Sequence, residues 1–346
     1  MDSLTHVVMG AALQGTLMGR WQGRKAMLYG AALATLPDLD VFASYPDPVS
    51  SLTHHRGYSH SVFVLTALAL VMAWLIRKRW PAAPYGPGRL LLTIWLVLIT
   101  HPLLDALTTY GTQLFWPLPY SPVSISSIYI VDPVFTLPLL AAFIGCLWKG
   151  AEHSRLRAGA LIFCAFYLAC TLVAKQGAER RVRRALAQQG THVEAIFSAP
   201  MPLNSLLWRV IARVPGGDYY EAVTGVLDRA PPELLRQPLH TELGAALDGD
   251  PLVARFNWFT RGWLRYDAVG RDLVVTDLRM GMPGYFLFRY EMGRQDASGR
   301  WVSVTPTRWA SERGGWPELK QVLRRVVDQQ PPLPLAAWAQ RNNAAQ

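Results

Sequence analysis

Hydrophobic residues are concentrated in the first half of this 346-residue chain. Long apolar runs broken by short polar stretches continue to about Lys175, and the remainder has the mixed pattern of a soluble protein. A helix needs about 20 mostly apolar residues to cross a membrane. We therefore expect about six apolar helical segments. They are 4–19, 26–36, 60–76, 90–107, 128–148 and 156–174.

The first two of these segments differ from the other four. They are shorter and rich in Gly and Ala, and small residues allow two helices to approach closely. We expect 4–19 and 26–36 to form a tightly packed helical pair, and two alternatives stay open: each segment crosses the membrane, or the pair does not fully span it.

From about Gly190 the pattern changes to short stretches in which aromatic and β-branched residues alternate with polar ones. Gly, Asp and Pro bound these stretches, which is typical of antiparallel strands. The clearest examples are 255–269, 272–281, 284–293 and 301–309. Residues 176–189 continue the last apolar segment as a basic helix, and 231–247 has the composition of one or two short helices. We found none of the G-x-S-x-G, H-E-x-x-H or phosphate-loop motifs here.

These patterns predict two domains. The first is an α-helical polytopic membrane domain at 1–178, and the second is a mostly β soluble domain at 179–346. The composition agrees, because only 17% of residues are charged, against roughly one quarter in soluble proteins. The net charge of +10 suits contact with anionic lipid. No basic stripe is interleaved with aromatic residues, so we expect membrane lipid as a partner and no nucleic acid.

Basic residues are distributed unevenly among the loops between the apolar segments. Ten lie in alternate loops, whereas the intervening loops contain only Arg56. Loops rich in Lys and Arg stay on the cytoplasmic side. With six passes, we expect a multi-pass inner-membrane protein whose C-terminal domain is periplasmic. The basic run 179–184 argues against this orientation, but long domains translocate largely regardless of charge.

On this topology, the acidic and histidine residues of the first half gather near the outer face. They are His6, Asp38, Asp40, His54, His55, His60, His101, Asp105 and Asp132. Ionisable groups within spanning segments are costly and usually functional. Imidazoles mixed with carboxylates suit zinc, iron or manganese. The pattern therefore predicts a metal site.

Local spacing adds detail to this site. His101 and Asp105 are four residues apart and share one face of a helix. Gly57 permits a sharp turn between His55 and His60, and Arg56 in that turn is placed to bind an anion. Simpler interpretations remain open: interfacial polar histidines, a polar turn at Asp38 and Asp40, or a structural or proton-relaying pair of His101 and Asp105.

Five stretches together resemble the YdjM-like family of bacterial membrane-bound, metal-dependent hydrolases. The stretches, which lie within about residues 1–150, are DSLTH, LPDLD, HHRGYSHS, HPLLDALTTYGTQLFWP and VDPVF. The resemblance implies a ligand set with Arg56 and Asp132 near it. The implied ligands are His6, Asp38, His55, His60, His101 and Asp105. The family is itself distantly similar to zinc-dependent phospholipase C enzymes, which implies clustered metal ions and phosphoester hydrolysis.

We therefore expect an inner-membrane hydrolase that cleaves a lipid or lipid-linked phosphoester at the periplasmic face. Zinc is the expected metal, with one to three ions, and manganese and iron are alternatives. Arg56 would stabilise charge on a phosphoryl oxygen, and Asp40 or Asp132 would serve as a general base. The competing classes are a metal transporter, which needs ligands at mid-bilayer, and a non-catalytic membrane factor with a closed metal site.

Overall fold

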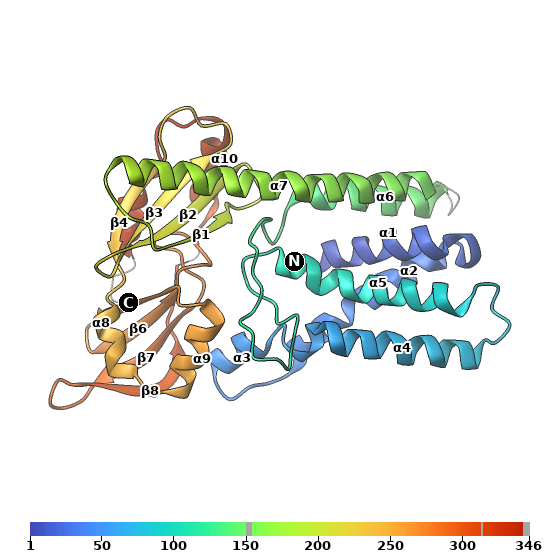
Figure 1. Cartoon of the computed structure of the whole chain (residues 1–346), viewed down its shortest axis with the longest axis horizontal. Helices are drawn as coiled ribbons and strands as arrows, with labels where there is room; N and C mark the ends of the chain where they lie inside the picture. Colours follow the sequence, from blue (N-terminus) through green and yellow to red (C-terminus); the bar gives the residue numbers. More distant parts are fainter. Residues whose placement is uncertain (150–153, 313, 342–346) are drawn as a thin grey trace. The chain divides into compact units, whose positions relative to one another are not determined.

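The computed structural model describes residues 1–149, 154–312 and 314–341 (Figure 1). The chain forms two compact units. The first comprises Met1–Ser44 and His54–Cys170, and the second comprises Tyr45–Thr53 and Thr171–Gln346. The second unit thus takes a short segment from within the first half of the sequence.

The first unit is a bundle of helices, in which α1 packs against α2, α5 and α6, and α4 packs against α5 (Figure 1). All six expected apolar segments contribute helices. These are α1 (Ser3–Gln22), α2 (Lys25–Thr35), α4 (Val62–Arg79), α5 (Pro87–Ala106), α6 (Pro133–Lys149) and the beginning of α7 (Ser154–Gln188). Two 3-10 turns, η1 (Pro37–Phe42) and η2 (Tyr58–His60), lie beside each other.

The expected count of six spanning segments is not confirmed. Within the described residues, two helices are long and apolar enough to cross a membrane, Pro87–Ala106 and Arg155–Gln188. A third is counted if the bent pair Pro48–His60 and Val62–Arg79 is one span. The helix α6 is shorter than its expected segment, because it begins only at Pro133. Asp132 precedes it and accepts hydrogen bonds from its first free amides.

The first two helices pack through their glycines, as their composition predicts. A Cβ atom built on Gly30 would overlap the carbonyl oxygen of Gly10, and one on Gly10 would overlap that of Gly30. The backbones of α1 and α2 are therefore in direct contact. This contact sets the distance between the helix that carries His6 and the helix that leads into Asp38.

The second unit contains two four-stranded antiparallel sheets, which confirms the expected β domain. One sheet has the order β1 (Ala195–Pro200), β2 (Leu207–Val214), β3 (Asp218–Gly225), β4 (Glu233–Pro238). The other has the order β5 (Leu264–Val269), β6 (Asp272–Asp277), β7 (Arg289–Gln295), β8 (Trp301–Arg308). The basic end of α7 is helical as predicted, and its Val182 and Leu186 pack with Trp208 in the core against the first sheet.

Five short helices and a 3-10 turn complete this unit. They are α3 (Pro48–His54), α8 (Thr241–Gly244), η3 (Ala245–Leu247), α9 (Pro251–Thr260), α10 (Trp316–Val327) and α11 (Leu335–Gln340). One expectation was wrong here, and another is confirmed in part. Residues 255–260 belong to α9 and not to a strand, because Asp250 caps the helix through Leu252 and Val253. The short helices expected within 231–247 form at 241–247, as α8 and η3, whereas Glu233–Pro238 is a strand that pairs with β3.

The glycine contact makes a stability prediction. Gly30→Ala is expected to destabilise the protein by about 1–3 kcal/mol, because the new methyl group has no space beside Gly10. Gly159→Ala in α7 is the control, because nothing lies within 4 Å of its Cβ position. Alanine there should be neutral or stabilise the helix by up to about 1 kcal/mol. Thermal unfolding in detergent measures both, and equal effects would contradict the close packing.

Candidate metal centre

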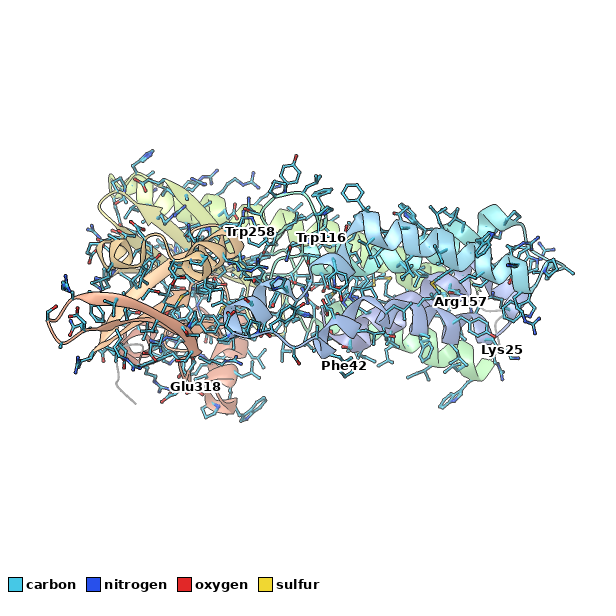
Figure 2. All side chains as sticks on the ribbon, turned by 90° about the horizontal axis from the view of Figure 1, so that it is seen from below. Lys25, Phe42, Trp116, Arg157, Trp258 and Glu318 are labelled. Atoms are coloured by element: carbon cyan, nitrogen blue, oxygen red, sulfur yellow. The ribbon has the colours of Figure 1, made fainter. Side chains whose placement is uncertain are left out.

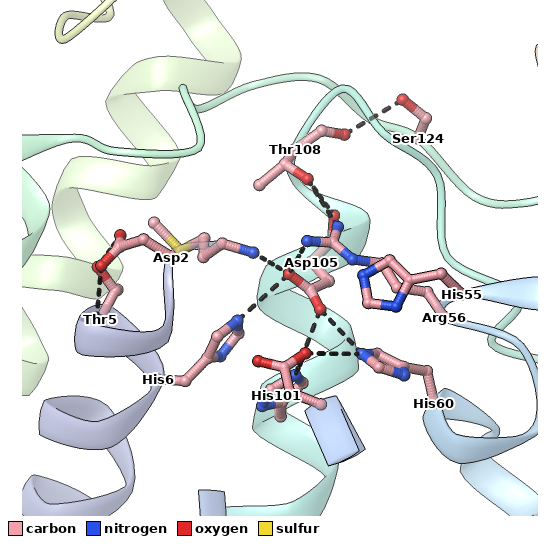
Figure 3. A network of polar contacts seen from close by, with 12 residues as sticks. Asp2, Thr5, His6, His55, Arg56, His60, His101, Asp105, Thr108 and Ser124 are labelled. Atoms are coloured by element: carbon pink, nitrogen blue, oxygen red, sulfur yellow. Dashed lines mark hydrogen bonds and ion pairs between the residues drawn. The ribbon is translucent and has the colours of Figure 1, made fainter. Parts of the chain in front are cut away.

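Four side chains from three parts of the first unit converge on one point (Figure 3). Asp38 lies in η1, His60 in η2, and His101 and Asp105 lie one turn apart near the end of α5. Each offers one ligand atom, and these four atoms all lie within 4.8 Å of one another. His60, His101 and Asp105 have fully buried side chains, whereas that of Asp38 is 27% exposed.

The separations among these atoms suit a small divalent ion. Asp38 Oδ1 lies 3.6 Å from His60 Nε2 and 3.3 Å from His101 Nε2. Asp105 Oδ2 lies 3.2 Å from His60 Nε2 and 3.4 Å from His101 Nε2. Ligands held tetrahedrally at the Zn–N and Zn–O distances would be about 3.3 Å apart. The group could therefore hold a metal ion.

Two of the converging ligand atoms have no hydrogen-bond partner among the described residues. His60 Nε2 and Asp105 Oδ2 are buried, and neither makes a hydrogen bond with any residue that the structure describes. A buried nitrogen and a buried carboxylate oxygen without partners would each cost free energy. A cation between them would compensate for that cost, and two nitrogen and two oxygen donors match a borderline ion such as zinc.

The outer hydrogen bonds of the two histidines orient their lone pairs. His101 Nδ1 donates to the carbonyl oxygen of Ala34 at 2.7 Å, and its Nε2 faces the carboxylates, 3.3 Å from Asp38 Oδ1. His60 Nδ1 donates to Ser59 Oγ at 2.9 Å, and Ser59 donates to Asp40 Oδ2 at 2.7 Å. Such outer partners fix the tautomer of metal-binding histidines and raise their basicity.

The two oxygens of Asp105 have separate contacts. Oδ1 forms an ion pair with Arg56 Nη2 at 3.0 Å and lies 3.2 Å from His6 Nε2, and the amino group of Met1 also contacts it. Oδ2 faces His60 and His101. One oxygen is thus neutralised and held in place by its neighbours, and the other remains available as a ligand.

Asp40 organises the turn that carries His60. Its carboxylate accepts hydrogen bonds from His55 Nδ1 at 2.9 Å, from the Arg56 amide at 3.0 Å and from Ser59. Burial acts to raise the pKa of Asp40, but the hydrogen bonds from His55 and Ser59 lower it overall. Burial also acts to raise the pKa of Asp38, but the imidazoles of His101 and His60 together lower it overall. Both carboxylates are therefore ionised at neutral pH.

Arg56 is held rigidly beside the centre. It has a left-handed backbone with φ of 60°, its Nη1 donates to Thr108 Oγ1 at 3.2 Å, and its guanidinium lies 4.9 Å from the ring centre of Tyr110. The loop from α5 to α6 supplies these contacts, and Gln113 in it also donates its amide to the Arg56 carbonyl at 3.0 Å.

Of the remaining predicted residues, His6 and His55 lie beside the four ligands. His6 stacks on His101, with ring centres 3.6 Å apart, and contacts Asp105. His55 binds Asp40, and its ring centre lies 6.1 Å from that of His60. Asp132 caps α6 and accepts a hydrogen bond from Tyr167 at 2.8 Å. Ser59 and Tyr110 were not predicted, although Ser59 directly precedes His60 within the HHRGYSHS stretch.

Comparison with known proteins assigns the half of the chain that carries this centre to a protein family. Residues 1–178 match the model of a family described as YdjM inner membrane protein. The chain belongs to this family. As a member of the YdjM family it is a membrane protein, and the matched region includes all four candidate ligands.

Two relatives extend this comparison. The chain is 26% identical over 220 residues to "Uncharacterized protein YfhP" of Bacillus subtilis, covering 61% of this chain and 64% of that protein. It is 33% identical over 98 residues to "Inner membrane protein YbcI" of Escherichia coli, covering 28% of this chain and 55% of that protein. The chain thus spans less than two thirds of each relative's length. No solved structure matches the chain.

The geometry predicts which substitutions release metal. His60→Ala and Asp105→Ala each remove a ligand and should lose most bound metal, because the remaining ligands leave the ion under-coordinated. His54→Ala is the control, since His54 neighbours the turn but is not one of the four ligands. Metal per folded protein, measured by elemental analysis after purification, tests this. Full metal content in both ligand variants would contradict the centre.

A second prediction concerns the outer hydrogen bonds. Ser59→Ala removes the acceptor of His60 Nδ1 and should weaken metal binding about 10–100-fold, with unchanged stoichiometry at saturating metal. Ser61→Ala is a matched control on the other side of His60, because Ser61 donates to the Trp116 carbonyl oxygen. Competition with a chromophoric chelator measures both affinities. Equal affinities for the two variants would show that Ser59 does not support His60.

Proposed function

We propose that this YdjM-family protein is a metal-dependent hydrolase of a lipid or lipid-linked phosphoester, with zinc as the preferred ion. The main support is the partial exposure of Asp38 beside three fully buried ligands. A structural metal site is usually closed, whereas a catalytic one keeps an accessible side. The accessible side here is the η1 turn.

The same turn is apolar on its outside. Leu39, Val41 and Phe42 are 52%, 67% and 82% exposed, and Phe42 projects away from the bundle (Figure 2). Exposed apolar side chains of this size suit contact with lipid. An amphiphilic substrate would meet the turn with its apolar part and present a phosphoester to the metal centre, which supports a lipid substrate over a soluble one.

A divalent ion at this position would act as a Lewis acid that polarises a phosphoryl oxygen and makes water acidic near neutral pH. Arg56 supplies a fixed positive charge next to Asp105, and its Nε makes no hydrogen bond to any described residue. We assign Arg56 to stabilising the charge that develops on the phosphoryl group.

The proton chemistry falls to His55 and Asp40. Asp40 accepts a hydrogen bond from His55 Nδ1–H, which leaves His55 Nε2 free of that proton and able to accept another. The His55 side chain is 31% exposed. This arrangement orients His55 as the general base and makes Asp40 its positioning residue. Asp132, which caps α6, has no role in this scheme.

The activity prediction separates metal binding from catalysis. Purified protein with zinc should release phosphate or a phosphorylated headgroup from lipid substrates in mixed micelles. His55→Gln should reduce kcat by about 10²–10⁴-fold and retain the metal, because His55 is not one of the four ligands. A deletion strain should accumulate the uncleaved lipid. If the purified, metal-loaded protein cleaves none of these lipids and the deletion strain has unchanged lipids, the results would instead favour the non-catalytic membrane factor.

We also propose a multi-pass arrangement with the C-terminal domain in the periplasm, supported by the basic residues of alternate loops. A fusion after Gln189 to a phosphatase that is active only in the periplasm should be active. If a reporter that works only in the cytoplasm is active when fused at the same point, the orientation is the reverse, and the metal centre lies at the inner face.

A further inference from the structure

The first unit contains a cavity of about 1230 Å³ that the metal centre does not use. It lies among α1, α2, α4 and α5. Its walls include Lys25 at the start of α2 and Leu36 just after that helix, and α2 of 11 residues is about 16 Å long. Asp38 follows Leu36, so the cavity extends from the end of α2 remote from the metal centre towards it.

The chemistry of the walls changes along the cavity. Its walls are largely apolar and include Leu33, Leu36, Met72, Leu90 and Ile94. The end remote from the metal centre carries Lys25 and Arg79, the two charged residues among the described residues of the lining. Lys25 lies at the far end of the helices from Phe42 (Figure 2). The cavity is therefore amphipathic: most of its walls are apolar, and its mouth is positively charged.

Aromatic side chains mark the level of the mouth. Trp21, Trp80 and Tyr85 line this end of the cavity, and Trp and Tyr prefer the headgroup level of a membrane. The loop that carries Tyr85 is fixed, because Arg77 Nη1 donates to the carbonyl oxygens of Ala83 and Tyr85 at 3.4 Å and 3.2 Å. The wall of the mouth is thus held in one conformation at the level of the lipid headgroups.

We propose that this cavity binds one anionic phospholipid. An acyl chain would fill the apolar part along α2, and the phosphate would lie at the mouth between Lys25 and Arg79. Charge complementarity selects an anionic lipid, because two cations face the mouth and none of the described residues that line the cavity is acidic. The site is independent of the proposed hydrolysis, since its charged end lies away from Asp38.

Lipid retention tests the charge at the mouth. Protein in detergent is mixed with equal phosphatidylglycerol and phosphatidylcholine, and bound lipid is counted by native mass spectrometry. We expect phosphatidylglycerol to be preferred, and Arg79→Gln to reduce that preference about 5-fold. Lys78→Gln is the matched control, because Lys78 and Arg79 each lie over a tryptophan but only Arg79 lines the cavity.

A second pair of variants tests the apolar part. Ala32→Trp should narrow the cavity and lower retention of both lipids at least 5-fold, because Ala32 lines it. Leu28→Trp adds the same ring one turn earlier on α2, at a residue that is 55% exposed and outside the lining. Equal retention of the two lipids by the unmodified protein would overturn the proposal. An equal loss in Arg79→Gln and Lys78→Gln, or in Ala32→Trp and Leu28→Trp, would also overturn it.

Discussion

The first unit depends on how one buried carboxylate is compensated. Asp105 is fully buried in an apolar bundle, where an unpaired charge would be very costly. Arg56, His6 and the amino group of Met1 all meet one of its oxygens. These groups come from the start of the chain and from the turn before α4, whereas Asp105 lies in α5, so the charge of a single residue draws together parts of the sequence that are far apart.

Asp40, which lies outside the four-ligand group, also holds several groups together through its carboxylate. It joins His55, the Arg56 amide and Ser59, and through Ser59 it reaches His60. The turn between α3 and α4 therefore has one conformation imposed on it from η1. The same carboxylate that shapes the turn also sets the tautomer of His55, so structure and proton chemistry share one group.

Much of this was predictable from the sequence where the cause is local. Apolar runs identify helices because hydropathy acts along one segment, and the Gly and Ala content of α1 and α2 indicated their close packing. The number of spans was not predictable in this way, because polar residues such as His6 and Gln14 lower the hydropathy of α1. The strand at Glu233–Pro238 depends on pairing with β3, a tertiary contact.

The centre shows the same division. Residue types and their position on the topology indicated a metal site, and the group of Asp38, His60, His101 and Asp105 could hold an ion. Which histidine nitrogen faces that point could not be predicted. It depends on partners such as the Ala34 carbonyl oxygen, which lies 67 residues away from His101. His55 illustrates the limit, because Asp40 rather than an adjacent residue determines its orientation.

The backbone contact of α1 and α2 has a consequence for biogenesis. Only Gly23 and Arg24 separate the two helices, so this hairpin can close once residue 35 has emerged from the ribosome. Its closure sets the spacing between His6 and the η1 turn before α5 has emerged. Asp105 follows residue 35 by some seventy residues in the sequence, and the nascent chain cannot complete the four-ligand group until Asp105 has emerged as well.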